Sequence, residues 1–178
     1  MRKAVLLLIT IFSVSASINA QNYLDGILPL KAEKVTYSGV IEAPGVAMKD
    51  LYQNARRWII MTYQSDKNIL QLDDFDNFEL IGDGFFVDSW ISTAFTTERV
   101  EVWQKIRIVA HRARISYEIT GFRLKYSLTN SENAYRTTLN YDIENWNQGR
   151  NNNRTRFFEQ LDVRVKELIE SLESAVQN

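Results

Sequence analysis

The chain has 178 residues, of which 45% are hydrophobic and 24% are charged, with seven Gly and two Pro. This composition is that of an ordinary globular protein and excludes collagen-like, low-complexity and intrinsically disordered chains. Its 21 Lys and Arg against 22 Asp and Glu give a formal net charge of -1, too balanced for bulk attraction to nucleic acid or to an anionic membrane. With no Cys and a single His, the chain lacks disulfide, iron–sulfur and thiol chemistry and any site that needs two imidazoles.

Residues 1–20 have the pattern of an export signal. Two cationic residues precede an apolar run over residues 4–14, and small and polar residues follow up to Ala20. The run is shorter than the roughly 20 apolar residues that a membrane-spanning helix needs. We therefore expect a signal peptide that is cleaved after Ser17 or Ala20, a periplasmic or secreted product, and no stable membrane anchor. The remaining chain has 19 basic and 22 acidic residues, a net charge of -3.

Residues 21–178 have the length of a single domain and contain no linker-like segment, with residues 21–32 as a short N-terminal extension. Residues 33–41 alternate between apolar and polar side chains, which predicts a half-buried strand. Apolar residues recur at three- and four-residue spacing over residues 48–63, which predicts an amphipathic helix. Residues 69–72 and 78–87 are strand-like, and Gly82 and Gly84 in the second segment predict a bulge or a bend.

The strongest strand signal lies between Val100 and Leu124. Apolar residues occupy even positions up to Ala110 and odd positions from Ala113, as a hairpin with one apolar face requires. A two-residue loop at either His111-Arg112 or Arg112-Ala113 preserves this parity. We favour the second loop, which places Arg107 opposite Glu118 and Trp103 opposite Phe122; the first places Lys105 opposite Glu118 and Trp103 opposite Thr120.

One more alternating run, residues 135–143, predicts a further strand, and residues 145–153 read as a polar connection. A helical apolar stripe then runs from Phe158 to Val176, about 20 residues or roughly 30 Å, which is long enough to cross a sheet. The predicted fold is α+β with two layers, in the order β-α-β-β-β-β(-β)-α. We expect an antiparallel sheet of about five or six strands with both helices on one face, because both apolar stripes need the same apolar side of the sheet.

Several motifs resemble a bacterial secreted family, common in Bacteroidota, described as a domain of unknown function with a TATA-binding-protein-like fold. The matching segments span residues 28 to 125: Leu28-Pro29-Leu30, Pro44-Gly45-Val46, Asp50-Leu51-Tyr52 with Ala55 and Trp58, Ile69 to Asp73, Ile81 to Gly84, and Arg114 to Phe122. Two positions depart from the family pattern, because Ala47 replaces a capping residue and Arg112-Ala113 replaces an Asp-Gly turn. The resemblance implies the fold and export, but no activity. DNA binding by the protein that gives the fold its name does not carry over, since fold alone does not fix function.

No combination of residues in the sequence clearly indicates a catalytic, metal-binding or cofactor-binding site. His111, the only imidazole, falls at a predicted hairpin tip without a nucleophile elbow in the sequence. The acidic residues between Asp73 and Asp88 invite a calcium interpretation, but an EF-hand loop aligned on Asp74 has Glu79 where Gly is required. The same carboxylates fix no glycosidase pair, and Gly82 and Gly84 lack the context of a dinucleotide loop. We therefore expect no catalytic, metal or cofactor-binding residues and no enzyme activity.

Charge is unevenly distributed along the chain. Residues 68–98 contain seven acidic and no basic residues, whereas residues 99–125 contain seven basic and two acidic residues. The simpler interpretation is that acidic and basic strands lie side by side and pair across the sheet, each exposed pair contributing under about 1 kcal/mol. A sharper hypothesis places a mixed aromatic and cationic surface on the sheet face away from both helices, comprising Trp103, Lys105, Arg107, Arg114 and Phe122.

Two classes of function remain. The first is an exported, non-enzymatic binding or interaction module that uses the open sheet face for self-association, for another exported protein or for an anionic glycan, and not for nucleic acid. The alternative is a helix-grip carrier of a hydrophobic small ligand, because the same order of elements describes that architecture. A carrier requires the sheet to curl around the final helix and enclose a cavity of several hundred cubic ångströms.

Overall fold

The structure is a computed structural model that describes residue 24 and residues 26–63, 68–93, 96–129, 136–146 and 152–177. In chain order its elements are β1 (Leu30–Lys31), β2 (Lys34–Val35), β3 (Tyr37–Glu42), α1 (Met48–Thr62), β4 (Leu70–Asp74), β5 (Glu79–Thr93), β6 (Thr96–His111), β7 (Arg114–Thr129), β8 (Arg136–Asp142), the 3-10 helix η1 (Ile143–Asn145) and α2 (Asn152–Gln177). Within these ranges no helix is both long and apolar enough to cross a membrane.

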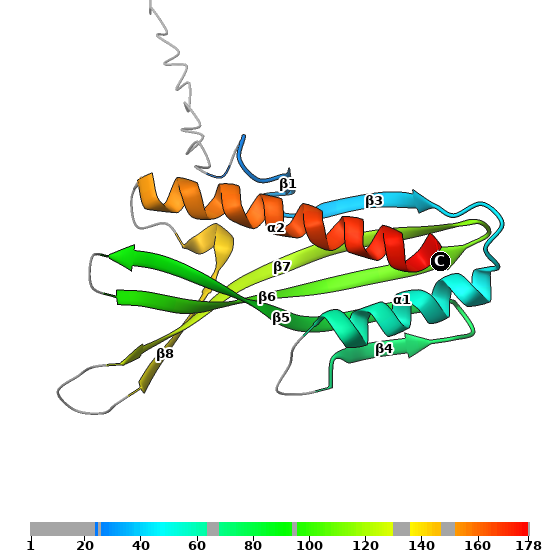
Figure 1. Cartoon of the computed structure of the whole chain (residues 1–178), viewed down its shortest axis with the longest axis horizontal. Coiled ribbons are helices and arrows are strands. Elements are labelled where there is room, and N and C mark those ends of the chain that lie inside the picture. Colours follow the sequence, from blue (N-terminus) through cyan, green and yellow to red (C-terminus); the bar gives the residue numbers. More distant parts are fainter. Residues whose placement is uncertain are drawn as a thin grey trace, which may run out of the picture.

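Six strands form one antiparallel sheet in the order β3-β7-β6-β5-β4. The sixth, β8, pairs with β7 over Arg123–Thr129, next to the stretch Arg114–Ile119 that pairs with β3, so β8 and β3 share one edge of β7. The β6–β7 register runs from His111–Arg114 to Val100–Tyr126. Past that point the hairpins β5–β6 and β7–β8 diverge, which forks the sheet (Figure 1).

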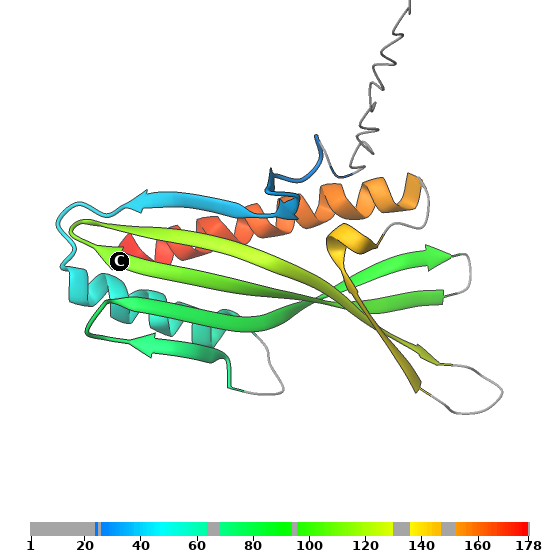
Figure 2. The same ribbon diagram turned by 180° about the vertical axis from the view of Figure 1, so that it is seen from behind.

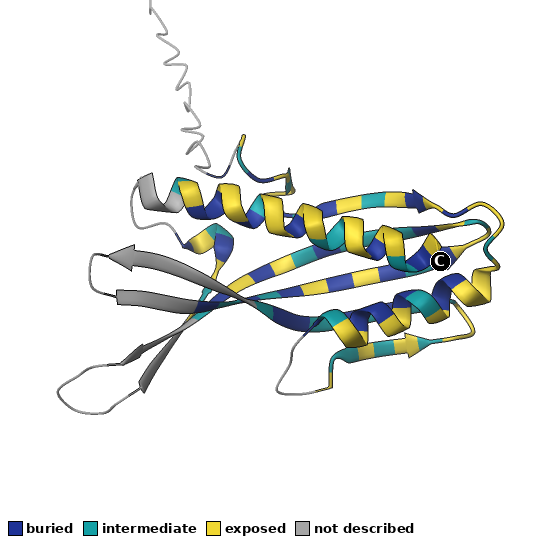
Figure 3. Ribbon diagram, viewed as in Figure 1, coloured by how far each residue is buried: buried dark blue, intermediate teal, exposed yellow. Residues whose placement is uncertain are grey.

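Both helices lie on the same face of the sheet, in front of it in Figure 1 and behind it in the reverse view of Figure 2. The strands alternate between buried and exposed residues, and each helix turns one buried side to the sheet (Figure 3). The helices also meet each other, where Trp58 Nε1 on α1 donates a hydrogen bond of 3.1 Å to Ser171 Oγ on α2. These features confirm the predicted two-layer α+β architecture and order of elements.

The sheet stays open, with β4 at one edge and β3 and β8 at the other. The helix-grip alternative requires in addition that the sheet curl around α2 and enclose a ligand cavity, and it stays a prediction. Among the described residues, no further layer covers the face opposite the helices (Figure 2). We call this side of the sheet the open face.

Local predictions were confirmed in part. The hairpin loop is Arg112-Ala113, because His111 pairs with Arg114 and Arg107 with Glu118. The predicted strand over residues 33–41 is instead divided into β2, which pairs with β1, and β3, which joins the main sheet. The final helix begins at Asn152, earlier than its apolar stripe indicates, because the first turns of a helix need no apolar side chain.

Candidate binding surfaces

A β-bulge in β7 determines which side chains reach the open face. Lys105 pairs with Thr120 but Trp103 pairs with Arg123, so β7 has one residue more than β6 over this stretch. Gly121 lies within the bulge and has a φ of +66°, a conformation that glycine adopts without a steric penalty. Because side chains alternate between the two faces of a strand, the inserted residue reverses the face that each later side chain of β7 occupies.

The bulge makes two sequence predictions wrong. Trp103 does not lie opposite Phe122, and Phe122 does not belong to the open face. Phe122 is fully buried on the helix side, where its ring meets Tyr37 edge-on at 5.9 Å between centroids. The signal in the sequence was a second change of apolar parity, from Ile119 to Phe122 and Leu124, on either side of a glycine.

The other four predicted residues, Trp103, Lys105, Arg107 and Arg114, do lie on strands at positions that face away from the core. Arg107 pairs with Glu79 of β5, with 2.6 Å between Nε and Oε1. These contacts confirm that acidic and basic strands pair across the sheet. Because both partners are partly exposed, each such pair adds little to stability.

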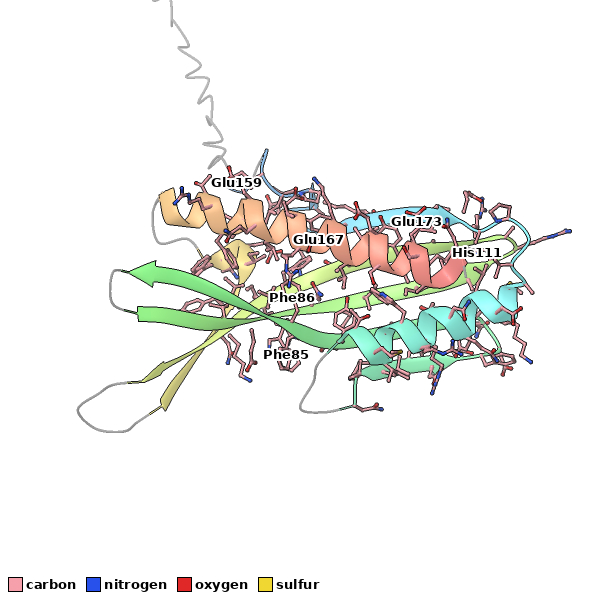
Figure 4. All side chains as sticks on the ribbon, in the orientation of Figure 1. Phe85, Phe86, His111, Glu159, Glu167 and Glu173 are labelled. Carbon is pink, nitrogen blue, oxygen red and sulfur yellow. The ribbon has the colours of Figure 1, made fainter. Side chains whose placement is uncertain are left out.

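An aromatic cluster interrupts the charged residues of the open face where the sheet forks. Phe85 on β5 and Trp103 on β6 lie 4.8 Å apart between ring centroids, and Phe85 is only 8% exposed. Figure 4 shows Phe85 and its neighbour Phe86 pointing to opposite sides of β5. Arg123 and Lys125 of β7 lie within 5.7 Å and 5.5 Å of the Trp103 ring, close enough for cation–π attraction.

Around this cluster the cations have acidic partners. Arg123 Nη2 lies 2.9 Å from Asp83 Oδ1, and Lys125 Nζ lies 2.9 Å from Glu101 Oε2. Trp103 Nε1 donates a hydrogen bond of 2.9 Å to the same Glu101 oxygen. The aromatic cluster is therefore held in place by charged groups and presents a mixed apolar and polar surface.

A second surface is a groove of about 580 Å³ between α1 and β4. Three exposed apolar side chains line it: Ile60 (42% exposed), Met61 (78%) and Phe75 (48%). They are half of the six exposed large hydrophobic side chains in the described part of the chain. Scattered exposed apolar residues need no explanation, but their concentration in one groove is typical of a binding surface.

The floor of the groove is a fixed hydrogen-bond network. Tyr52 on α1 donates its hydroxyl hydrogen to Asp73 on β4, and Arg56 Nε lies 2.7 Å from the other carboxylate oxygen. Burial alone would raise the pKa of the Asp73 carboxyl, but the hydrogen bonds from Tyr52 and Arg56 outweigh it and hold that pKa below its ordinary value. Burial, and then the hydrogen bond to Asp73, raise the pKa of Tyr52. Both groups keep their ordinary charge at neutral pH.

The core contains one polar anomaly. Gln104 on β6 is fully buried beside the Tyr63 hydroxyl, but neither its amide atoms nor that hydroxyl makes a hydrogen bond of good geometry within the described residues. Gln104 lies opposite Gly84 of β5 and beside the bulge at Gly121. Such groups are rare in native cores, because each one loses its hydrogen bonds to water on folding.

His111 and the acidic residues of the 73–88 segment, which the sequence analysis weighed for catalysis and for calcium binding, make local contacts in the described part of the chain. His111 lies at the exposed end of β6 (Figure 4), with Nε2 3.2 Å from Ser116 Oγ and no carboxylate bonded to the ring. Asp74, which invited the calcium interpretation, instead accepts hydrogen bonds from the backbone and side chain of Asn77. No group of three or more potential metal ligands is present there either.

Comparison with known proteins agrees with the architecture. A TBP-like protein from Parabacteroides distasonis superposes with a TM-score of 0.61 at 15% identity, over 85% of this chain and 98% of the other. A DUF4468 family protein from Bacteroides ovatus gives a TM-score of 0.55 at 20% identity, over 83% and 92%. No curated protein matches the chain. The profile of one family, "Domain of unknown function (DUF4468) with TBP-like fold", matches residues 37–126, and the chain therefore belongs to this family.

Proposed function

We propose that the protein is an exported, non-enzymatic interaction module that binds through its open face. The observation that carries this proposal is the Phe85–Trp103 cluster, an aromatic pair on the side of the sheet opposite the two described helices, α1 and α2. Aromatic residues with flanking Arg are enriched at the centres of protein interfaces. A purely solvated sheet face would need neither the aromatic pair nor the cations placed beside it.

A second copy of the chain is the partner that this surface fits best. Acidic side chains on β5, Glu79 and Asp83, lie beside basic side chains on β6 and β7, Arg107 and Arg123. Two such faces stacked about a two-fold axis place the acidic row of each copy against the basic row of the other, the self-complementarity that an isologous dimer requires. With strands about 4.8 Å apart and a rise of about 3.3 Å per residue, the face covers on the order of 800 Å², the area a standard interface buries per partner.

Sedimentation velocity across a concentration series tests this association. We expect a reversible dimer in the wild-type protein and a shift to monomer in Trp103→Ser, because removal of the ring deletes the apolar centre of the interface. Val163→Ser, an exposed apolar site on α2, is the matched control and leaves the dimer unchanged. A protein that stays monomeric at every concentration, with Trp103→Ser indistinguishable from it, contradicts association through this face.

Export rests on the sequence pattern of residues 1–20. Expression of the whole sequence in a Gram-negative host, followed by fractionation and intact-mass measurement, tests it. We expect a periplasmic or secreted product that begins after Ser17 or Ala20. An uncleaved product in the cytoplasm contradicts the proposal.

A further inference from the structure

The groove between α1 and β4 has a positive charge that its internal hydrogen-bond network does not neutralise. Arg56 and Asp73 neutralise each other through the 2.7 Å contact from Arg56 Nε. Arg57, which also lines the groove, makes no ion pair or hydrogen bond with any described residue. The terminal nitrogens of Arg56 likewise bond to no group in the described ranges. The groove therefore has an excess of one positive charge, with guanidinium donors still free.

The apolar part of the groove adjoins these donors. Ile60 and Met61 lie three and four residues after Arg57 on α1, which places them on the same side of the helix, and Phe75 follows the end of β4 on the far side. Phe75 is held in position by the Tyr52 ring, which meets it edge-on at 5.5 Å between centroids. Because Tyr52 is itself tied to Asp73, both the polar and the apolar parts rest on the same fixed network. This arrangement orders the groove before any ligand arrives.

We propose that this groove binds a single-chain amphiphilic anion. Its carboxylate or phosphate head pairs with Arg57 and with the free nitrogens of Arg56, and its hydrocarbon tail lies on Ile60, Met61 and Phe75. Guanidinium groups bind both kinds of head through charge-assisted hydrogen bonds. A volume of about 580 Å³ lies within the range of small-molecule sites, roughly 300–1,000 Å³. This site is distinct from the open face, so the two proposals fail or succeed separately.

Methionine methyl NMR reports on the groove directly. Protein expressed from the full sequence with ¹³C-methyl methionine has a probe within the groove, Met61, and a reference at the other end of α1, Met48. We expect dodecanoate and dodecyl phosphate, titrated below their micelle concentrations, to shift the Met61 signal saturably and to leave the Met48 signal unchanged. The tighter of the two identifies the preferred head group.

Matched variants separate recognition of the anionic head from nonspecific hydrophobic binding. Arg57→Ala should weaken binding about tenfold, the change expected for the loss of one charge-assisted hydrogen bond. Lys49→Ala, a cation on the same helix outside the groove, should leave binding unchanged, and Met61→Ser should weaken it through the tail. Dodecyltrimethylammonium should bind more weakly than dodecanoate.

Three results would overturn the proposal. The first is equal shifts of Met48 and Met61, which indicate nonspecific adsorption of the amphiphile. The second is equal affinity for the cationic and anionic amphiphiles, or for wild-type protein and Arg57→Ala. The third is binding to phosphatidylglycerol vesicles without binding to either monomeric anion, which assigns the surface to a membrane instead of a soluble ligand.

Discussion

Ile59 on α1 and Gly82 on β5 pack so closely that a β-carbon on the glycine would lie 2.8 Å from Ile59 Cγ2 and 3.2 Å from Ile106 Cγ2. Such contacts are shorter than packed side chains tolerate. Gly82 therefore lets the helix approach the sheet directly above this strand. It also lies opposite the irregular register of β4, where Leu70 pairs with Gly82 and Leu72 with Ile81. The extra residue of this irregularity, Gln71, belongs to β4, whereas β5 pairs regularly with β6 across Gly82 and Gly84, so the predicted bulge lies on the neighbouring strand and not at these glycines.

Gly82→Ala should lower the free energy of unfolding by about 1–3 kcal/mol, because the added methyl group overpacks the core. Ile59→Ala makes room for that methyl group, so the double variant should lose less than the sum of the two single losses. Urea denaturation of the four proteins measures the coupling. Strict additivity would show that the two residues do not contact each other as described.

Gln104→Met should stabilise the protein by about 1–2 kcal/mol, because it replaces two buried polar atoms that lack a hydrogen bond of good geometry with an apolar side chain of similar size. Gln104→Glu should destabilise it, since a buried carboxylate without a partner is costlier still. Thermal and urea denaturation give both values. A loss of stability in Gln104→Met would mean that the amide has partners and contributes to the fold through them.

Gly121→Ala should lower the free energy of unfolding by about 1 kcal/mol or more through backbone strain at φ +66°. Steric overlap is not the cause, because the nearest atom to an added β-carbon is Lys105 Cβ at 4.0 Å. Gly121→Asn should be milder, since Asn tolerates the left-handed region better than Ala. Equal effects of the two substitutions on the denaturation midpoint would argue against strain as the reason for this glycine.

Asp73→Asn should lower the free energy of unfolding at pH 7 by on the order of 1 kcal/mol, because the bonds to Tyr52 and Arg56 lose their charge. The folded state holds the pKa of Asp73 below the ordinary value that it has in the unfolded chain, so its contribution to stability is fully present above that ordinary value. As the pH falls further, wild-type Asp73 becomes protonated and the difference between the two proteins should shrink. Asp76→Asn, at an exposed aspartate, is the control. A difference that grows toward low pH contradicts this assignment.

The fold was largely predictable because its signals are local and periodic. Apolar stripes indicated α1 and α2, and the parity change around Arg112-Ala113 indicated the correct hairpin register. Ala113 occupies a positive φ of 59°, a conformation that its side chain does not favour, so turn chemistry alone would not have identified this loop.

The candidate surfaces were less predictable, because they depend on single inserted residues and on contacts between distant segments. One extra residue at Gly121 moved Phe122 into the core and brought Arg123 beside Trp103. The α1–β4 groove joins residues about 17 positions apart, such as Arg56 and Asp73, and neither stands out in the sequence. Nothing in the sequence indicated a role for Phe85 either, because the ring that it contacts, Trp103, is on another strand.

Cysteine cross-linking tests the central claim, association through the open face, most directly. The chain has no Cys, so a single introduced thiol reports on one position only. Lys105→Cys places a thiol on β6 near the middle of the open face, and Val163→Cys places one on the exposed side of α2. With a short bismaleimide, we predict that Lys105→Cys forms a covalent dimer at concentrations where Val163→Cys does not. Cross-linking through Val163→Cys alone, or through neither position, would contradict a dimer built on the open face.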